Sequence, residues 1–110
     1  MPDVMVDRRR SLRFPLVVMA EVTVLSNGTK HTARTSDVSR TGCYLDTLNP
    51  APRGEQVRVR LIQRNQSFEA LATVMYVSQG LGMGVQFEED LAPAQLAILN
   101  AWLEEASRKV

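Results

Sequence analysis

The chain has few of the residues that build disulfides or metal sites. Its 110 residues include one cysteine, Cys43, and one histidine, His31. A single cysteine cannot form a disulfide within the chain, and one cysteine with one histidine cannot supply the ligand cluster of a structural zinc site. We therefore expect neither a resident metal nor a cofactor.

Long apolar runs and a strong charge of one sign are also missing. No stretch approaches the roughly 20 apolar residues that cross a bilayer, and residues 1–7 lack the regions of a secretion signal. Thirteen Lys and Arg residues against twelve Asp and Glu leave a formal net charge of +1. A protein that binds long nucleic acid needs a broad basic face. We expect a cytoplasmic protein that binds neither membranes nor long nucleic acid.

The patterns of common enzyme sites are absent. His31 has no second catalytic group at triad spacing, and Cys43 sits in an apolar run, where we expect a small inward-facing hydrophobe. Gly80, Gly82 and Gly84 precede an expected strand, whereas phosphate-binding glycine loops precede a helix. We therefore expect a binding protein and not an enzyme.

Apolar residues instead alternate with polar ones in segments separated by turn signals, which is typical of half-buried strands. Asn27-Gly28 and Asn65-Gln66 each mark a hairpin. The six expected strands are residues 14–24, 30–38, 43–45, 57–61, 68–77 and 83–87. This all-β pattern predicts a small barrel or a sandwich.

The last part of the chain has a different period. Leu96, Leu99 and Leu103 recur at spacings of three and four, and Pro93 suits a first helical position. We expect an amphipathic C-terminal helix over residues 93–108 that covers an open side of the strands. Trp102 is expected in its buried face.

Four arginines gather before the first strand: Arg8, Arg9, Arg10 and Arg13. Residues 1–11 are polar and have no period, so we expect a flexible N-terminal arm there, followed by a barrel domain with its helix over residues 12–110. The arginine fork matches phosphate oxygens and guanine edges. The cluster is either a solvated tail or one side of a site for a small anion.

A second group of polar residues follows the second expected strand. Asp37 and Ser39 lie two positions apart, which places their side chains on the same side, and Gly42 permits a tight turn. Such residues usually form a side-chain-capped turn between strands. A carboxylate and a hydroxyl beside bare backbone also match the donors of a guanine base.

Taken together, the two segments resemble the PilZ domain family. The matching motifs are Arg-x-x-x-Arg at residues 9–13 and Asp-x-Ser-x-x-Gly at residues 37–42, and "GMGVQFEE" at residues 82–89 looks like the last strand of the family. The resemblance implies a six-stranded antiparallel β-barrel with a C-terminal α-helix. It also implies a receptor for cyclic di-GMP that signals to a downstream protein, which the sequence does not identify.

The resemblance assigns roles to five motif residues. Arg9 and Arg13 are expected to hold phosphates and the Hoogsteen edge of guanine. Asp37 and Ser39 are expected to read a guanine. Gly42 is expected where a side chain would intrude on the turn.

Two further residues bear on how the ligand is held. Arg8 precedes the Arg-x-x-x-Arg motif, a position that the family associates with ligand stoichiometry, so we expect an intercalated dimer of cyclic di-GMP. Tyr76 lies on an expected strand; packing under the C-terminal helix is favoured for it over stacking on a base.

Two other functions remain open from the sequence. One is a ligand-independent protein-interaction adaptor with the same fold. The other is a small barrel that binds single-stranded nucleic acid through Arg58, Arg60 and Arg64, although such proteins stack bases on exposed aromatic residues and this chain has six aromatics.

Overall fold

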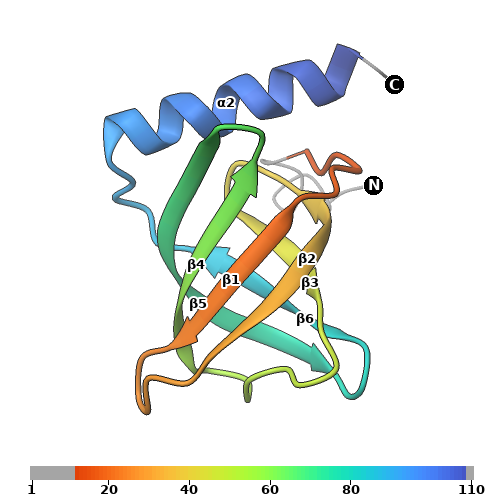
Figure 1. The fold of residues 1–110 in the computed structure, drawn as a ribbon, viewed down its shortest axis with the longest axis vertical. Helices are drawn as coiled ribbons and strands as arrows, with labels where there is room; N and C mark the ends of the chain where they lie inside the picture. The colour runs from red at the N-terminus through yellow and green to blue at the C-terminus, as the bar shows by residue number, and fades with distance from the viewer. Residues whose placement is uncertain (1–11, 109–110) are drawn as a thin grey trace, which may run out of the picture.

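The protein is described here by a computed structural model covering residues 12–108 (Figure 1). The chain forms six strands and then one helix. These elements are β1 (Met19–Val24), β2 (Lys30–Val38), β3 (Gly42–Asp46), β4 (Gln56–Gln63), β5 (Gln66–Ser78), β6 (Gly82–Phe87) and α2 (Pro93–Arg108).

The strands close into an antiparallel barrel in the order β1-β2-β3-β6-β5-β4, with β4 returning to β1. Four of the pairings join strands adjacent in the chain, and β3 also pairs with β6 across a long connection. This confirms the barrel that the family resemblance implied. The sandwich that the strand spacing also allowed is not formed.

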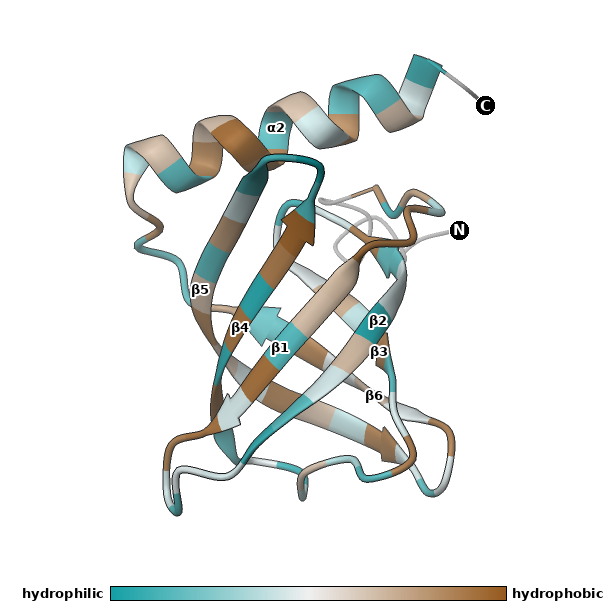
Figure 2. Ribbon diagram, viewed as in Figure 1, coloured by the Kyte–Doolittle hydropathy of each residue, from teal (hydrophilic) through white to brown (hydrophobic). Residues whose placement is uncertain are grey.

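Alternate residues of each strand fill the barrel, as period-2 patterning requires. Figure 2 shows this alternation of apolar and polar positions along the strands. The core includes Ala20, Val22, Val57, Val59, Leu61, Phe68, Val74, Met83 and Val85. The rings of Phe68 and Phe87 lie 5.1 Å apart within it.

Helix α2 lies across one open end of the barrel (Figure 1). It buries Leu99, Trp102, Leu103 and Ala106, and Trp102 donates its indole N–H to Gln66 Oε1 at 3.2 Å. The helix therefore covers apolar side chains that the end of the barrel would expose. Both the expected helix and the core position of Trp102 are confirmed.

The expected strand at residues 14–24 is wrong in its first half. β1 begins only at Met19, and Phe14 makes an isolated antiparallel bridge with Val38. Pro15 has no N–H to donate to a ladder. Beside the backbone bond from the Thr35 N–H to Val18 O, the hydroxyl of Thr35 holds this segment, since it donates to Leu16 O at 2.6 Å and accepts from the Val18 N–H at 2.9 Å.

The second hairpin is also displaced by one residue from its expected position. Gln63 pairs with Gln66, so the turn residues are Arg64 and Asn65, and Arg64 takes a φ of 57°. Tight hairpin turns require positive φ, which arginine adopts less readily than asparagine or glycine. In the first hairpin the positive φ falls on a glycine, Gly28, at 73°, and the Asn27 side chain accepts a hydrogen bond from the Thr29 N–H.

Within residues 12–108, no helix has the length and apolar character needed to span a membrane.

Replacing Thr35 by valine tests the role of its buried hydroxyl. Thr35→Val keeps the shape of the side chain but leaves the Val18 N–H and Leu16 C=O without this partner, and the expected loss is about 1–3 kcal/mol in the free energy of unfolding. Urea denaturation measures it. The control is Thr32→Val on the exposed side of β2, which should stay within about 0.5 kcal/mol of the wild type; equal losses in both variants would contradict the assignment.

Candidate ligand-binding site

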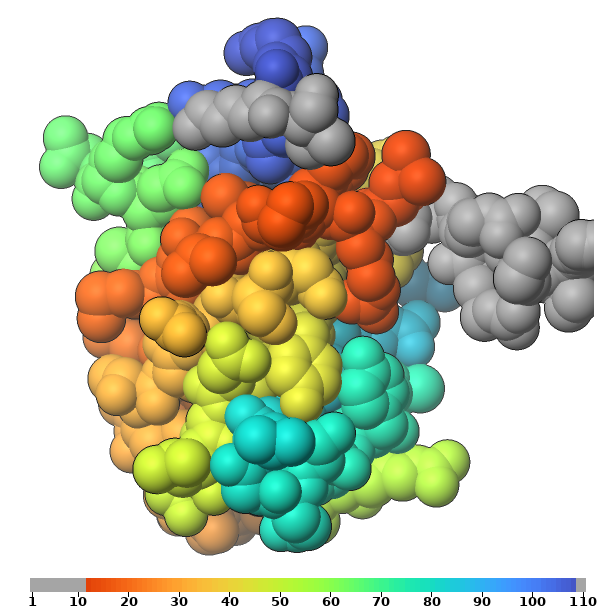
Figure 3. Space-filling view, turned by 90° about the vertical axis from the view of Figure 1, so that its right-hand side faces the viewer, coloured from red at the N-terminus to blue at the C-terminus, as the bar shows by residue number. Residues whose placement is uncertain are grey.

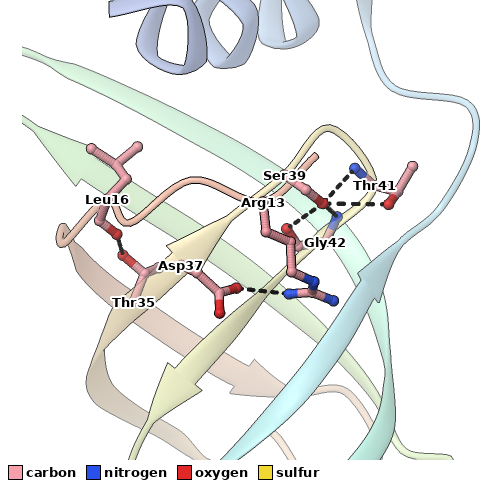
Figure 4. Close-up of polar contacts among 7 residues, drawn as sticks. All are labelled: Arg13, Leu16, Thr35, Asp37, Ser39, Thr41 and Gly42. Atoms are coloured by element: carbon pink, nitrogen blue, oxygen red, sulfur yellow. Dashed lines mark hydrogen bonds and ion pairs between the residues drawn. The ribbon is translucent and has the colours of Figure 1, made fainter. Parts of the chain in front are cut away.

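Arg13 and Asp37 are brought together by the fold, although 24 positions separate them. Arg13 Nη1 donates to Asp37 Oδ1 at 2.7 Å, and the two side chains are 47% and 36% exposed (Figure 4). A guanidinium carries five donors and a carboxylate about four acceptor sites. The pair therefore keeps most of its hydrogen-bonding capacity directed to solvent.

The position of this pair depends on how the segment before β1 crosses β2. The Phe14 bridge to Val38 and the Thr35 hydrogen bond to Leu16 hold this segment on both sides of Asp37; the second of these contacts is drawn in Figure 4. The register of β2 against β3 also shifts between Thr35 and Asp37. A bulge of this kind re-aims side chains locally.

The Ser39 hydroxyl makes its hydrogen bonds within the turn between β2 and β3. Its Oγ accepts from the N–H groups of Thr41 and Gly42 at 3.2 and 3.1 Å and donates to the Gly42 carbonyl at 3.1 Å. The residue is only 1% exposed. Ser39 thus shapes the turn that follows Asp37, and in this conformation its hydroxyl faces the turn and not the solvent (Figure 4).

Gly42 is required by the approach of β6. A Cβ at this position would lie 2.2 Å from the carbonyl oxygen of Val85, closer than any non-bonded contact allows. Any side chain here would force β3 and β6 apart. The motif glycine therefore has a packing role in the barrel itself.

Arg8, Arg9 and Arg10 lie outside the described residues. Their expected roles stay predictions. Arg13 contacts Asp37 of β2, and Figure 3 shows the first described part of the chain, in red, on the surface of the barrel.

Cys43 lies inside the barrel directly beneath this site. Burial, helped by the nearby Asp37 carboxylate and opposed by the Arg13 guanidinium, raises the pKa of its thiol to about 12. The thiol is thus neutral at physiological pH. The expectation of an inward-facing small hydrophobe is confirmed.

The basic residues of β4 and its hairpin face glutamates. Arg58 contacts Glu69 at 3.4 Å, Arg60 contacts Glu21 at 3.1 Å, and Arg64 contacts Glu105 at 3.3 Å. These are exposed ion pairs. A nucleic-acid groove needs a positive track along the strand, and here each of these arginines has a carboxylate beside it. The pairs count against the single-stranded nucleic-acid alternative.

Tyr76 does not occupy the place favoured for it from the sequence. It is 46% exposed and lies near the end of β5 farthest from α2 (Figure 1), with its ring against Tyr44 and over Gly84. Packing under the helix was therefore the wrong expectation. Tyr44 belongs to neither motif, but its place between inward-facing Cys43 and Leu45 is a period-2 signal for an outward side chain.

A model of the PilZ domain family matches residues 7–105. The chain belongs to the PilZ domain family. The match includes both arginine positions of the first motif and the whole of the second. Arg13 and Asp37, which face each other here, are thus the meeting point of the two PilZ motifs.

Solved structures share the fold of this PilZ domain at low sequence identity. The PilZ domain of YcgR from Escherichia coli, solved with c-di-GMP, is 15% identical, with a TM-score of 0.75 and 93% of each chain covered. The PilZ domain of CeSA from a cellulose-synthesizing bacterium is 17% identical, with a TM-score of 0.64 and coverage of 88% of this chain and 96% of that one. Identities this low establish the fold alone.

A third solved structure is longer than this PilZ domain. The inhibitor of motility MotI/DgrA from Bacillus subtilis is 17% identical, with a TM-score of 0.74; 93% of this chain is covered but only 53% of that chain. The comparison with curated proteins found no match.

The raised pKa of Cys43 predicts how the thiol reacts and how stability depends on pH. At pH 8 a thiol reagent such as DTNB should label the protein only after unfolding in urea, since the folded thiol is both buried and neutral. Because the pKa of the thiol in the folded protein lies above the ordinary value of 9.0, the folded protein holds this proton more tightly than the unfolded chain does. The contribution of the protonated thiol to the free energy of unfolding is therefore complete below pH 9 and is lost as the pH rises towards about 12.

Cys43→Ala is the control for the pH dependence. It should flatten the fall in the free energy of unfolding between pH 9 and 11 relative to the wild type. Stoichiometric labelling of the folded protein at pH 8 would contradict the buried, neutral thiol.

Proposed function

We propose that this PilZ domain is a non-catalytic receptor for cyclic di-GMP in the bacterial cytoplasm, and that ligand binding changes its contact with a downstream protein. The observation that carries the proposal is the exposed Arg13–Asp37 pair, which joins the two family motifs at one point of the surface. Solved relatives of the same fold were determined with c-di-GMP bound, which supports the choice of ligand.

The chemistry of the pair suits a guanine nucleotide. Asp37 keeps its second carboxylate oxygen for the N1 and N2 donors of a guanine, and Arg13 keeps donors for a phosphate or for the guanine O6 and N7 acceptors. Ser39 and Gly42 contribute by holding the turn that positions Asp37. In this proposal the ligand adds to the ion pair without having to replace it.

The proposed response is a closure of the arginine arm. Arg8 and Arg9 would add two cations to Arg13 around the two phosphates of each cyclic di-GMP, and each charge-assisted contact contributes about 1.5–3 kcal/mol. Residues 1–11 then become fixed over the barrel.

In this proposal, closure of the arm also affects helix α2, because the residue next to Arg13 lies in a cleft beside the helix. Leu12 and Arg40 line a cleft of about 300 Å³ against Leu103 and Glu104 of the helix. A ligand that fixes Arg13 therefore also fixes its neighbour in this cleft. The arm, the β2–β3 turn and α2 together would form the composite surface that a downstream protein recognises.

Arg13→Ala and Asp37→Ala test the proposed site by calorimetry with cyclic di-GMP. Each variant should bind at least tenfold more weakly than the wild type, because it removes one or more charge-assisted hydrogen bonds to the ligand. The matched control is Arg60→Ala: Arg60 is also 47% exposed and paired with a carboxylate at 3.1 Å, but it lies on β4. It should bind within about twofold of the wild type.

Two results would reject this proposal. A folded wild type that gives no binding with cyclic di-GMP would favour the ligand-independent adaptor. Equal affinity for GMP or GTP would indicate a generic anion site.

The stoichiometry is a separate prediction. If Arg8 stacks on a base and bridges two ligands, wild-type titrations saturate at two cyclic di-GMP per chain, and Arg8→Ala saturates at one. Saturation of the wild type at one ligand per chain would exclude the intercalated dimer and leave the receptor intact.

A further inference from the structure

Two tyrosines continue the candidate site around the outside of the barrel. The strand registers pair Asp37 with Tyr44, Tyr44 with Gly84, and Gly84 with Tyr76. These four residues therefore form one row across β2, β3, β6 and β5. At a strand spacing of about 4.8 Å the row extends roughly 14 Å from Asp37.

The tyrosine rings lie flat on β6 because glycines stand beneath them. A Cβ at Gly84 would meet the Tyr76 ring at 2.2 Å, and one at Gly82 would meet the Tyr44 ring at 2.8 Å. The two rings are neighbours with similar orientation, their centroids 6.1 Å apart and their planes inclined by 27°. With one side of the pair against the backbone, the other side is left to the solvent.

Tyr76 is unusually exposed for an aromatic residue, and Tyr44 is half-buried. Tyr76 is 46% exposed, although aromatic rings usually contribute their area to a core. Next to Tyr44 the surface opens into a groove of about 740 Å³, which His31, Arg34, Asp46 and Leu81 also line. A planar ligand that starts at Asp37 thus meets two aromatic rings and free space beyond them.

We propose that Tyr44 and Tyr76 form an aromatic ledge on which a purine base of the ligand stacks while its phosphates lie at Arg13. Flat rings are held by stacking on exposed aromatic faces in proteins that bind unpaired bases. The inference rests on the proposed function and adds a specificity element: the ledge requires a base, whereas the arginines require only an anion. Gly82 and Gly84 leave room for the two rings against the backbone of β6, because a Cβ at either position would meet a ring.

The rings have a structural alternative, because an aromatic side chain over a glycine stabilises a sheet by covering its backbone. The experiment must therefore separate affinity from stability. Calorimetry with cyclic di-GMP and thermal unfolding are measured on the wild type, Tyr76→Leu, Tyr76→Phe and Met75→Ala. Met75 is the matched control because it is the adjacent residue, is 45% exposed and carries no ring.

The ledge predicts that Tyr76→Leu binds about tenfold more weakly at temperatures where it is folded. Tyr76→Phe should stay within about twofold of the wild type, since the ring is retained, and so should Met75→Ala. NMR of the unaltered protein provides a readout that no variant can disturb: the ring protons of Tyr44 and Tyr76 should shift upfield on saturation with cyclic di-GMP.

Each contrary result has a distinct meaning. Wild-type affinity in folded Tyr76→Leu, unchanged ring signals, or an equal loss in Met75→Ala would overturn the ledge and leave the receptor in place. Failure of the wild type to bind cyclic di-GMP at all would overturn the proposed function, and the ledge with it.

Discussion

Closure of six strands into a small barrel is the constraint on which the rest of the structure depends. Because the sheet has no free edge, every strand must present one set of alternate residues to a single packed interior. The inner set is mostly apolar, with Thr35 as a buried polar member, and the open end that remains is covered by α2. The outer set is then free to carry charges and rings, and Asp37, Tyr44 and Tyr76 belong to it.

The candidate site depends on the points where this regular pattern is interrupted. The segment before β1 has no continuous ladder and is held by the Phe14–Val38 bridge, by one backbone bond to Val18 and by the hydroxyl of Thr35. The β2 register shifts between Thr35 and Asp37, and the β5 register shifts between Val74 and Tyr76. These irregularities bring Arg13 to Asp37 and turn Tyr76 outward, so regular strands build the scaffold and irregular positions present the chemistry.

Much of the fold could be predicted from the sequence because it is set locally. Alternation located five of the strands to within a few residues, and Pro93 marked the first residue of the helix. The start of β1 could not be predicted in this way, since the Val18 N–H just before it bonds a hydroxyl 17 positions away and not a strand backbone. The row from Asp37 to Tyr76 could not be predicted from the sequence either, because β3 lies beside β6 only in the closed barrel. The pairing of Arg13 with Asp37 was anticipated only through the family motifs.

The residues of the Asp-x-Ser-x-x-Gly motif have two different roles, one in the fold and one at the surface. Ser39 and Gly42 are fixed by the turn and by the backbone of β6, so a barrel of this shape needs them whether or not it meets a nucleotide. Asp37 and Arg13 face the solvent and satisfy no such need. When sequences with this fold are screened for ligand binding, the serine and the glycine therefore indicate only the fold. The aspartate and the arginine are the residues that indicate a binding site.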